Sequence, residues 1–347
     1  MRSMSRFVFF LSGKHSTLPS SEAMASVEAL GENYNFVEKL DQVLVLESDA
    51  KALDLSRRLG MCHWIGEHFC ICSLDNLFDC IGSSDLVDFL PQSKTLAVRV
   101  KRVGNHFPEV DTQSLAKQVA DLLMEEYDYE IDLENPDNEI KLILSEEKCV
   151  VSLLRRKVDR EIFSERKPPE RSEVHPSTMQ PNLARSLVNL ARTPEGGSFL
   201  DPFCGVGGIL IEAGLVGAEV IGVDINSELI EGARNNLESE NITNYDLRKG
   251  DARELDVKRV DAIATDPPYG RQASTGGSEL GELYRQTLPK LAAVLKTGKF
   301  LCITSPERID LEEISKDLPL TLKEKHKQRV HRSLTRNIYT FIKRERV

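Results

Sequence analysis

The carboxyl-terminal half of the chain alternates short apolar runs with amphipathic stretches, and this alternation constrains the fold more than any other feature. Strands are expected at residues 198–200, 219–224, 245–249, 260–265 and 299–304, and helices at 208–215, 227–240 and 279–295. Strands that alternate with helices over short connections form a parallel sheet that helices cover on both faces. Residues 177–347 are therefore predicted to be a doubly wound α/β domain, closed by a hairpin at 320–330 and 337–343.

Two smaller α+β segments are expected before this domain. In residues 1–65, apolar runs at 6–11 and 36–47 flank a helical stretch at 21–32, which predicts a β-α-β beginning. In residues 66–160, the pattern predicts a strand with one basic edge at 96–102, a helix at 112–126, and strands at 139–144 and 149–154. Residues 161–176 are rich in proline and charge, as linkers are.

The composition points to a protein of the reducing cytoplasm. No apolar stretch approaches the roughly 18 residues of a membrane helix, so we expect no membrane partner. The apolar run at 7–11 is too short for the core of a signal peptide. An odd number of cysteines, seven, does not form a disulfide framework.

Several cysteines and histidines cluster early in the chain: Cys62, His63, His68, Cys70, Cys72 and Cys80. Their spacing lacks the paired C-x2-C knuckle of convincing zinc sites. The spacing alone therefore favours buried or scattered thiols, and we predict no metal site from it.

The net charge of −10 argues against a broadly basic surface, but two regions, 148–171 and 323–346, are locally basic. A localised basic stripe can bind phosphates while the rest of the chain stays acidic. The alternative is an ordinary solvated surface. The nucleic-acid contacts predicted from the basic strand edge and the first basic region are Arg99, Lys101, Arg102, Arg155, Arg156 and Lys157.

A glycine-rich turn follows the first strand of the α/β domain and reads Asp201-Pro202-Phe203-Cys204-Gly205-Val206-Gly207-Gly208. Glycines let the backbone approach a ligand closely, but this spacing departs from the G-x-G-x-x-G of dinucleotide sites. The carboxylate of Asp201 would repel a pyrophosphate and suits a ligand with an ammonium group. S-adenosylmethionine (AdoMet) carries such a group together with a sulfonium.

Two further carboxylates follow the next two strands. Asp224 is predicted to accept hydrogen bonds from ribose hydroxyls, and Asp251 from an adenine amino group. Each acid taken alone is more often a cap or loop residue, but three at successive strand ends of one sheet share a crevice. The other predicted cofactor contacts around these acids are Phe203, Gly205, Gly207, Ile225, Ala252 and Asp266.

The fourth strand is followed by Thr265-Asp266-Pro267-Pro268-Tyr269-Gly270, the most specific motif in the chain. An exocyclic amino group on a base is a poor nucleophile because its lone pair is delocalised into the ring. Asp266 and the Pro267 carbonyl can accept its two hydrogens, since proline fixes the backbone that aims the carbonyl. Tyr269 offers a face on which an extruded base can stack. The alternative is that two prolines merely end a strand.

With these motifs in place, the α/β domain resembles the amino-methyltransferases that carry (D/N)-P-P-Y after the fourth strand. The whole chain resembles the archaeal THUMP-domain tRNA (guanine-10) N2-methyltransferases, relatives of the catalytic subunit of the eukaryotic enzyme. Residues 163–171 and 175–185 are similar to the family's entrance to the catalytic domain. Residues 97–102 and 132–137 are similar to its THUMP core.

The resemblance implies a ferredoxin-like domain and a THUMP domain ahead of a Rossmann-like catalytic domain, with AdoMet as donor and tRNA as substrate. It assigns the THUMP unit to grip the acceptor end of tRNA. It also implies that Thr178 and Met179 face the methionine portion of AdoMet, and that Asp at 266 fits guanine-N2 chemistry. Relatives of the family sometimes use a small activating protein subunit.

Two alternatives remain open at this point. The catalytic motif also permits another target, such as an rRNA guanine or an adenine amino group. A non-catalytic RNA-binding protein with a vestigial AdoMet fold is the other, although the intact acids and D-P-P-Y motif argue against decay. The motif does not distinguish one methyl transfer from two.

Overall fold

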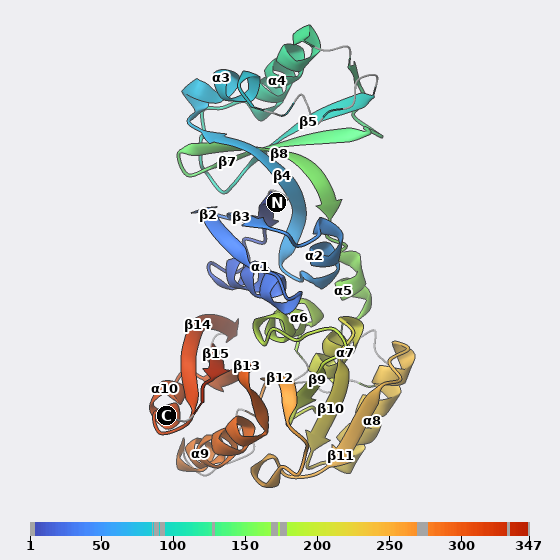
Figure 1. Ribbon diagram of the computed structural model, residues 1–347, viewed down its shortest axis with the longest axis vertical. Helices are drawn as coiled ribbons and strands as arrows, with labels where there is room; N and C mark the ends of the chain where they lie inside the picture. Colours follow the sequence, from blue (N-terminus) through green and yellow to red (C-terminus); the bar gives the residue numbers. More distant parts are fainter. Residues whose placement is uncertain are drawn as a thin grey trace. The chain divides into compact units, whose positions relative to one another are not determined.

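The computed structural model describes residues 4–84, 86, 90, 94–126, 129–167, 173, 179–268, 277–331 and 334–345 (Figure 1). The chain divides into two compact units. The first comprises Met1–Ser20, Glu32–Ser56 and Cys62–Asp159, and the second comprises Ser21–Gly31, Arg57–Met61 and Arg160–Val347. Each unit is built around its own sheet.

The chain begins with a β-α-β-β-α-β arrangement. Its elements are β1 (Ser5–Leu11), α1 (Leu18–Ala29), β2 (Tyr34–Leu40), β3 (Val43–Ser48), α2 (Ala52–Arg58) and β4 (Cys62–Cys72). The strands lie in the order β2-β3-β1-β4 with antiparallel neighbours, which is the ferredoxin-like order. The single run predicted at 36–47 is wrong, because the chain turns at Asp41 and at Gln42, which has a φ of 57°, and so forms two paired strands.

The sheet of the first unit continues from β4 into further strands, in the order β4-β8-β7-β5-β6. The elements are η1 (Leu74–Asn76), α3 (Leu77–Gly82), β5 (Thr95–Arg102), α4 (Thr112–Glu126), β6 (Glu130–Ile131), β7 (Asn138–Ser145) and β8 (Lys148–Lys157). Figure 1 shows α3 and α4 along one face of this part of the sheet. There Leu77 and Val119 of the helices pack against Val98, Leu142 and Val151 of the strands.

The second unit contains the predicted doubly wound sheet, with strands in the order β11-β10-β9-β12-β13-β15-β14. The strands are β9 (Ser198–Asp201), β10 (Glu219–Asp224), β11 (Tyr245–Lys249), β12 (Val260–Thr265), β13 (Leu295–Pro306), β14 (Leu320–His331) and β15 (Leu334–Lys343). The first five are parallel, and β15 and β14 close the edge as an antiparallel hairpin. These boundaries agree with the sequence prediction to within a few residues.

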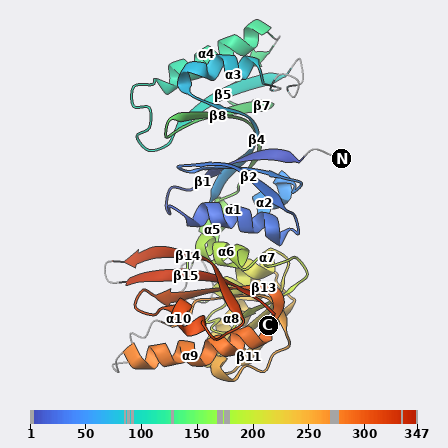
Figure 2. The same ribbon diagram turned by 60° about the vertical axis from the view of Figure 1, so that its left-hand side comes forward.

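Helices cover both faces of this sheet (Figure 2). The helices from residue 161 onward are α5 (Glu161–Glu165), α6 (Pro181–Leu190), α7 (Gly208–Leu215), α8 (Ser227–Ser239), α9 (Gly277–Val294) and α10 (Leu311–Ser315). On the α9 side, Tyr284 and Leu288 are buried against Leu200, Ile263 and Phe341 of the strands. Among the described residues, no helix is both long enough and apolar enough to span a bilayer.

Candidate active site

The strand order reverses between β9 and β12, so the chain leaves these neighbouring strands toward opposite edges of the sheet. In open α/β sheets, ligands bind at such a switch point, beyond the carboxyl ends of the strands. Asp201 ends β9, Asp224 ends β10, and Asp266 follows β12. Three of the predicted acids therefore lie along the edge where a ligand is expected.

The glycine-rich turn is fixed between β9 and β10. The Cys204 N–H donates to the Val223 carbonyl at 3.0 Å, and the Gly205 N–H donates to Asp224 Oδ2 at 3.0 Å. Gly205 and Gly207 have φ angles of 51° and 83°, in the left-handed region that glycine adopts without strain. A Cβ on Gly207 would also lie 3.3 Å from Ala233 Cβ of α8. The turn therefore needs glycine both for its backbone conformation and for its close packing.

Asp201 is buried, with 1% of its surface exposed. Its Oδ1 accepts hydrogen bonds from Thr265 Oγ1 at 2.7 Å and from the Phe203 N–H at 3.1 Å. The pKa of Asp201 is raised to about 7, chiefly by burial; the hydrogen bonds from Thr265 and Phe203 oppose this shift, and the negative charges of Asp266 and Asp224 add to it. A site where carboxylates act on one another in this way favours a cationic ligand.

The β10 and β11 ends carry the predicted nucleoside contacts. Besides Gly205, Asp224 binds the Asn226 N–H through Oδ1 at 2.9 Å. Ile225 is 66% exposed, so its apolar side chain is available to a flat ring. Asp251 is paired with Arg253, whose Nε lies 2.9 Å from Oδ1, and this pairing lowers the pKa of Asp251. The buried Ala252 begins the short helix η3 (Ala252–Glu254).

Asp266 is held by two side chains that the sequence did not single out. Thr304 of β13 donates to its Oδ1, and Arg336 of β15 donates from Nη1 to its Oδ2 at 3.0 Å. Arg336 is itself oriented by Gln328, which accepts from its Nε at 2.7 Å. Because β13 and β15 follow β12 in the sheet, their residues reach the end of β12. An arginine 70 residues from the motif has no local pattern that would reveal this role.

The remaining predicted site residues differ in burial, and two of them lie outside the part of the chain that the structure describes. Pro267 is buried and Pro268 is exposed. Met179 is buried, 7% exposed, two residues before α6 begins. Thr178 and Tyr269 lie outside the described residues, so their predicted contacts with the cofactor and the base stay predictions.

The predicted nucleic-acid contacts lie on β5 and β8 of the first unit. Arg99, Lys101, Arg156 and Lys157 are exposed. Arg99 and Lys157 nevertheless contact the buried carboxylate of Glu139, at 2.5 and 3.5 Å.

Two of the predicted nucleic-acid contacts, and one further arginine of the predicted basic region 148–171, have intramolecular partners. Arg102 donates to the Val110 carbonyl, and Arg155 Nε donates to Glu67 at 2.6 Å. Arg166, part of the predicted basic region, is buried and binds Glu212 at 3.1 Å, so its assignment to a basic surface is wrong.

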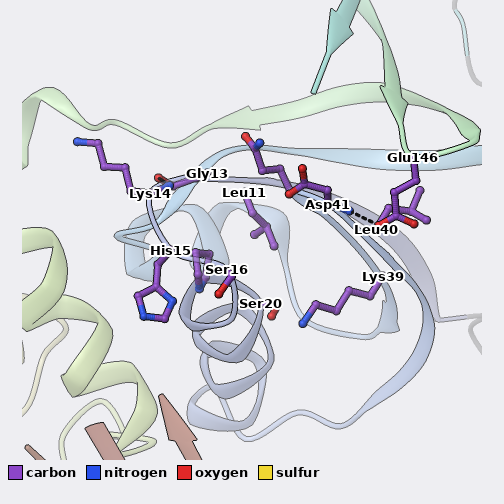
Figure 3. A pocket seen from close by; sticks show the side chains of 13 residues that line it. Leu11, Gly13, Lys14, His15, Ser16, Ser20, Lys39, Leu40, Asp41 and Glu146 are labelled. Atoms are coloured by element: carbon purple, nitrogen blue, oxygen red, sulfur yellow. Dashed lines mark hydrogen bonds between the residues drawn. The ribbon is translucent and has the colours of Figure 1, made fainter. Parts of the chain in front are cut away.

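A cavity of about 450 Å³ lies in the first unit, beside the loop between β1 and α1 (Figure 3). Lys14 and His15 line it from that loop, and Lys39 and Asp41 line it from the β2–β3 hairpin. None of the described residues that line it is a predicted cofactor or catalytic residue. The chemistry is therefore assigned to the strand ends of the second unit, where the carboxylates gather.

Two known protein families match separate parts of the chain. Residues 72–154 match the THUMP domain, and residues 168–338 match a family described as the RMKL-like methyltransferase domain. Among solved structures, TrmN from Thermus thermophilus superposes with a TM-score of 0.55 at 19% identity, covering 97% of this chain and 99% of that one. SMU.472, solved with SAH bound, superposes with a TM-score of 0.53 at 16% identity over the full length of both chains. These structures share the fold.

Curated relatives match over nearly the whole length. A tRNA (guanine(10)-N2)-dimethyltransferase of Methanothermobacter thermautotrophicus is 34% identical over 330 residues, covering 94% of this chain and 96% of its own. A protein of the same name from Methanocaldococcus jannaschii is 32% identical, covering 96% of this chain and 99% of its own. The chain therefore belongs to the family of archaeal tRNA (guanine(10)-N2)-dimethyltransferases.

Proposed function

We propose that this chain methylates the exocyclic N2 amino group of guanine 10 in tRNA, with AdoMet as the donor, and that it can add two methyl groups. The observation that carries the proposal is the carboxylate of Asp266, which Arg336 and Thr304 fix at the end of β12. It stands beside a glycine turn and two further acids at the switch point of the sheet.

The residues at the switch point fit AdoMet. Asp201 and Asp224 offer negative charge and hydrogen-bond acceptors to an ammonium group and ribose hydroxyls, and the exposed Ile225 offers an apolar contact to adenine. The positive φ of Gly205 and Gly207 lets the backbone approach the ligand closely. When bound, AdoMet supplies a methyl group that its sulfonium already activates.

Asp266 is proposed to orient the guanine amino group. A carboxylate accepts several hydrogen bonds at once, and Thr304 and Arg336, which donate to Asp266, fix its orientation. In the proposal the Asp266 carboxylate accepts one amino hydrogen of the guanine, and the Pro267 carbonyl accepts the other. Holding both hydrogens in acceptors draws the lone pair out of conjugation and toward the methyl group. Fixing this geometry before reaction supplies much of the rate.

The target base must leave its stack to reach Asp266, which costs a few kcal/mol. We propose that Tyr269 stacks on the extruded guanine and offsets part of this cost. The first unit is proposed to bind the tRNA through the predicted basic residues of β5 and β8. The proposed domains are ferredoxin-like 1–65, THUMP 66–160, a linker 161–176 and the catalytic domain 177–347, with β4 (Cys62–Cys72) running across the first boundary.

A cytoplasmic location, which the composition indicates, and a small activating subunit, which the sequence resemblance implies, belong to this proposal as well. The second would be tested by comparing turnover of the purified chain with turnover in a cell extract.

The proposal is tested by methyl transfer from labelled AdoMet to unmodified tRNA transcripts, with the modified nucleosides identified by mass spectrometry and mapped. N2-methylguanosine at position 10, followed by N2,N2-dimethylguanosine, is expected. Asp266→Ala should bind AdoMet almost as well as the native chain while transfer is lost. Methylation at a different nucleotide would overturn the target, and full turnover by the variant would overturn the role of Asp266.

A further inference from the structure

Three cysteine thiols of the first unit converge from two different elements. Cys70 and Cys72 lie on β4 and Cys80 lies on α3, and their Sγ atoms are all within 4.8 Å of one another. Residues two apart on a strand point to the same face, and α3 packs on β4. The fold thus brings together thiols that the sequence spacing alone leaves scattered, and it leaves Cys62 apart, where its Sγ donates to the Phe10 carbonyl at 3.3 Å.

A fourth thiol lies next to this group. Cys149 of β8 is directly opposite Cys72 in the antiparallel pairing of β4 with β8. Directly opposed residues share one face of a sheet, with Cβ atoms about 4.5–5.5 Å apart. Cys149 is fully buried, so its side chain is directed into the same helix-covered core as the other three.

The surroundings distinguish this cluster from ordinary core packing. A single buried cysteine behaves as a small hydrophobic residue. Here α3 already supplies Leu77 and Ile81 to the core, while Cys72 and Cys80 stay partly exposed at its edge. Sulfur therefore faces sulfur at a place that a small ion can reach from solvent.

We propose that Cys70, Cys72, Cys80 and Cys149 bind one Zn²⁺ ion as a structural site. Zinc prefers four tetrahedral thiolate ligands at about 2.3 Å, which places neighbouring sulfurs about 3.8 Å apart. The Sγ atoms of Cys70, Cys72 and Cys80, all within 4.8 Å of one another, reach that spacing by movements of about 1 Å. Cys149 is not in this group, and its side chain must rotate further to bind the same ion. Hard cations such as Mg²⁺ and Ca²⁺ take oxygen ligands and do not suit this set.

The ion would hold α3 on the sheet. A helix of 6 residues is not stable by itself in water, so α3 depends on tertiary contacts. Four protein ligands leave no open coordination position, which makes the site structural and not catalytic. The site acts within the unit proposed to bind RNA and does not depend on the proposed methyl transfer.

The first test is the zinc content of the full chain, purified in a reducing buffer without chelators and measured by elemental mass spectrometry. One zinc per chain is expected. Cys72→Ser and Cys80→Ser should each lower the bound zinc at least tenfold. Cys62→Ser is the matched control, because a hydroxyl can still donate to Phe10 and Cys62 is outside the cluster; it should keep the full zinc content.

Cobalt substitution reports the ligands directly, since thiolate-to-cobalt charge-transfer absorption grows with the number of thiolates. Four thiolates are expected, and Cys149→Ser should reduce the band by about one quarter. An unchanged band in that variant would overturn Cys149 as the fourth ligand.

Measurements on the wild-type protein test the zinc site even if a cysteine variant fails to fold. Chelating the zinc should speed hydrogen exchange at 74–82 and leave 198–265 unchanged. Absence of zinc together with no charge-transfer band would overturn the proposal, as would a disulfide within the cluster in freshly prepared protein.

Discussion

At the scale of single residues, Asp266 depends on a partner that lies 70 positions further along the chain. Arg336 has only 8% of its side chain exposed, and Asp266 has 14%. Removing one member of a pair this enclosed strongly destabilises the folded chain, because the other charge is left buried without its partner. Arg336 touches neither the donor nor the base in our proposal and is therefore a positioning residue.

Replacement of Arg336 by methionine is predicted to lower kcat on the order of 10²-fold, because a misplaced catalytic group loses that much. The KM for tRNA should change little, since Arg336 is not proposed to bind RNA. Single-turnover and steady-state kinetics measure the two effects separately. Arg329→Met, at an exposed position of β14, is the control and should keep native kinetics. A higher KM for tRNA with an unchanged kcat would contradict the positioning role.

Asp201 should give AdoMet binding a distinctive pH dependence. Its pKa of about 7 means that lowering the pH below 7 protonates the carboxylate that would bind the ammonium group. Affinity should therefore fall as pH drops below 7, and fall again above about pH 8 as the α-amino group of AdoMet loses its proton. Calorimetric titration from pH 5.5 to 9 measures this profile. Asp201→Asn should bind weakly and lose the acidic limb, and an acidic limb that survives would exclude Asp201.

At the scale of elements, the glycine turn joins β9 to α7 and packs directly on α8. Gly207 has a φ of 83°, and a Cβ added there would lie 3.3 Å from Ala233 Cβ and 3.4 Å from Ala233 Cα. Gly298 has a similar φ of 77° but has open space around it. Comparing alanine substitutions at the two positions therefore separates the effect of backbone strain from the effect of displacing a neighbouring helix.

Gly207→Ala is predicted to destabilise the chain and to weaken AdoMet binding about tenfold or more. Gly298→Ala should cost about 1–2 kcal/mol of backbone strain alone and leave AdoMet binding unchanged. Thermal unfolding and AdoMet titration of both variants make the comparison. Equal AdoMet affinities in the two variants would show that the conformation of the turn is not what shapes the cofactor site.

The elements of the second unit were largely predictable, and those of the first were less so. Periodicity and turn residues predict β9 through β12 because each strand there is short and bounded by glycine, proline or an acid. The hairpin at Gln42 was missed because no glycine or Asn-Gly pair marks that turn. The amphipathic α6 and the long β4 were missed as well.

The acids of the site could be predicted because each lies at the end of a strand or within two residues after it. Arg336, Thr304 and the thiol cluster could not, because they depend on which strands become neighbours. The order β12-β13-β15 and the β4–β8 pairing are properties of the folded sheets, and local patterns do not carry them.

At the scale of the whole molecule, the net charge of −10 opposes the binding of tRNA, which is itself a polyanion. The exposed basic residues of β5 and β8 belong to the first unit, whereas the acids that suit a cationic cofactor belong to the second. The proposed division of labour separates RNA binding from chemistry, so the two should respond to different substitutions.

Removal of Lys101 and Arg156 together, both to alanine, should raise the KM for tRNA and leave kcat and AdoMet affinity unchanged. Each lost phosphate contact should also reduce the salt dependence of binding by about one in the log–log slope. Lys117→Ala with Lys290→Ala changes the net charge equally at exposed positions outside β5 and β8 and is the control. If both pairs weaken tRNA binding alike, general charge and not a defined RNA surface is responsible.

The most direct test of the central claim compares two tRNAs that differ in one amino group. One carries guanosine at position 10, and the other carries inosine, which lacks only the exocyclic N2 amino group. With labelled AdoMet, the guanosine tRNA should take up to two methyl groups and the inosine tRNA none at that position. Equal incorporation into both tRNAs would contradict methylation of the guanine-10 amino group.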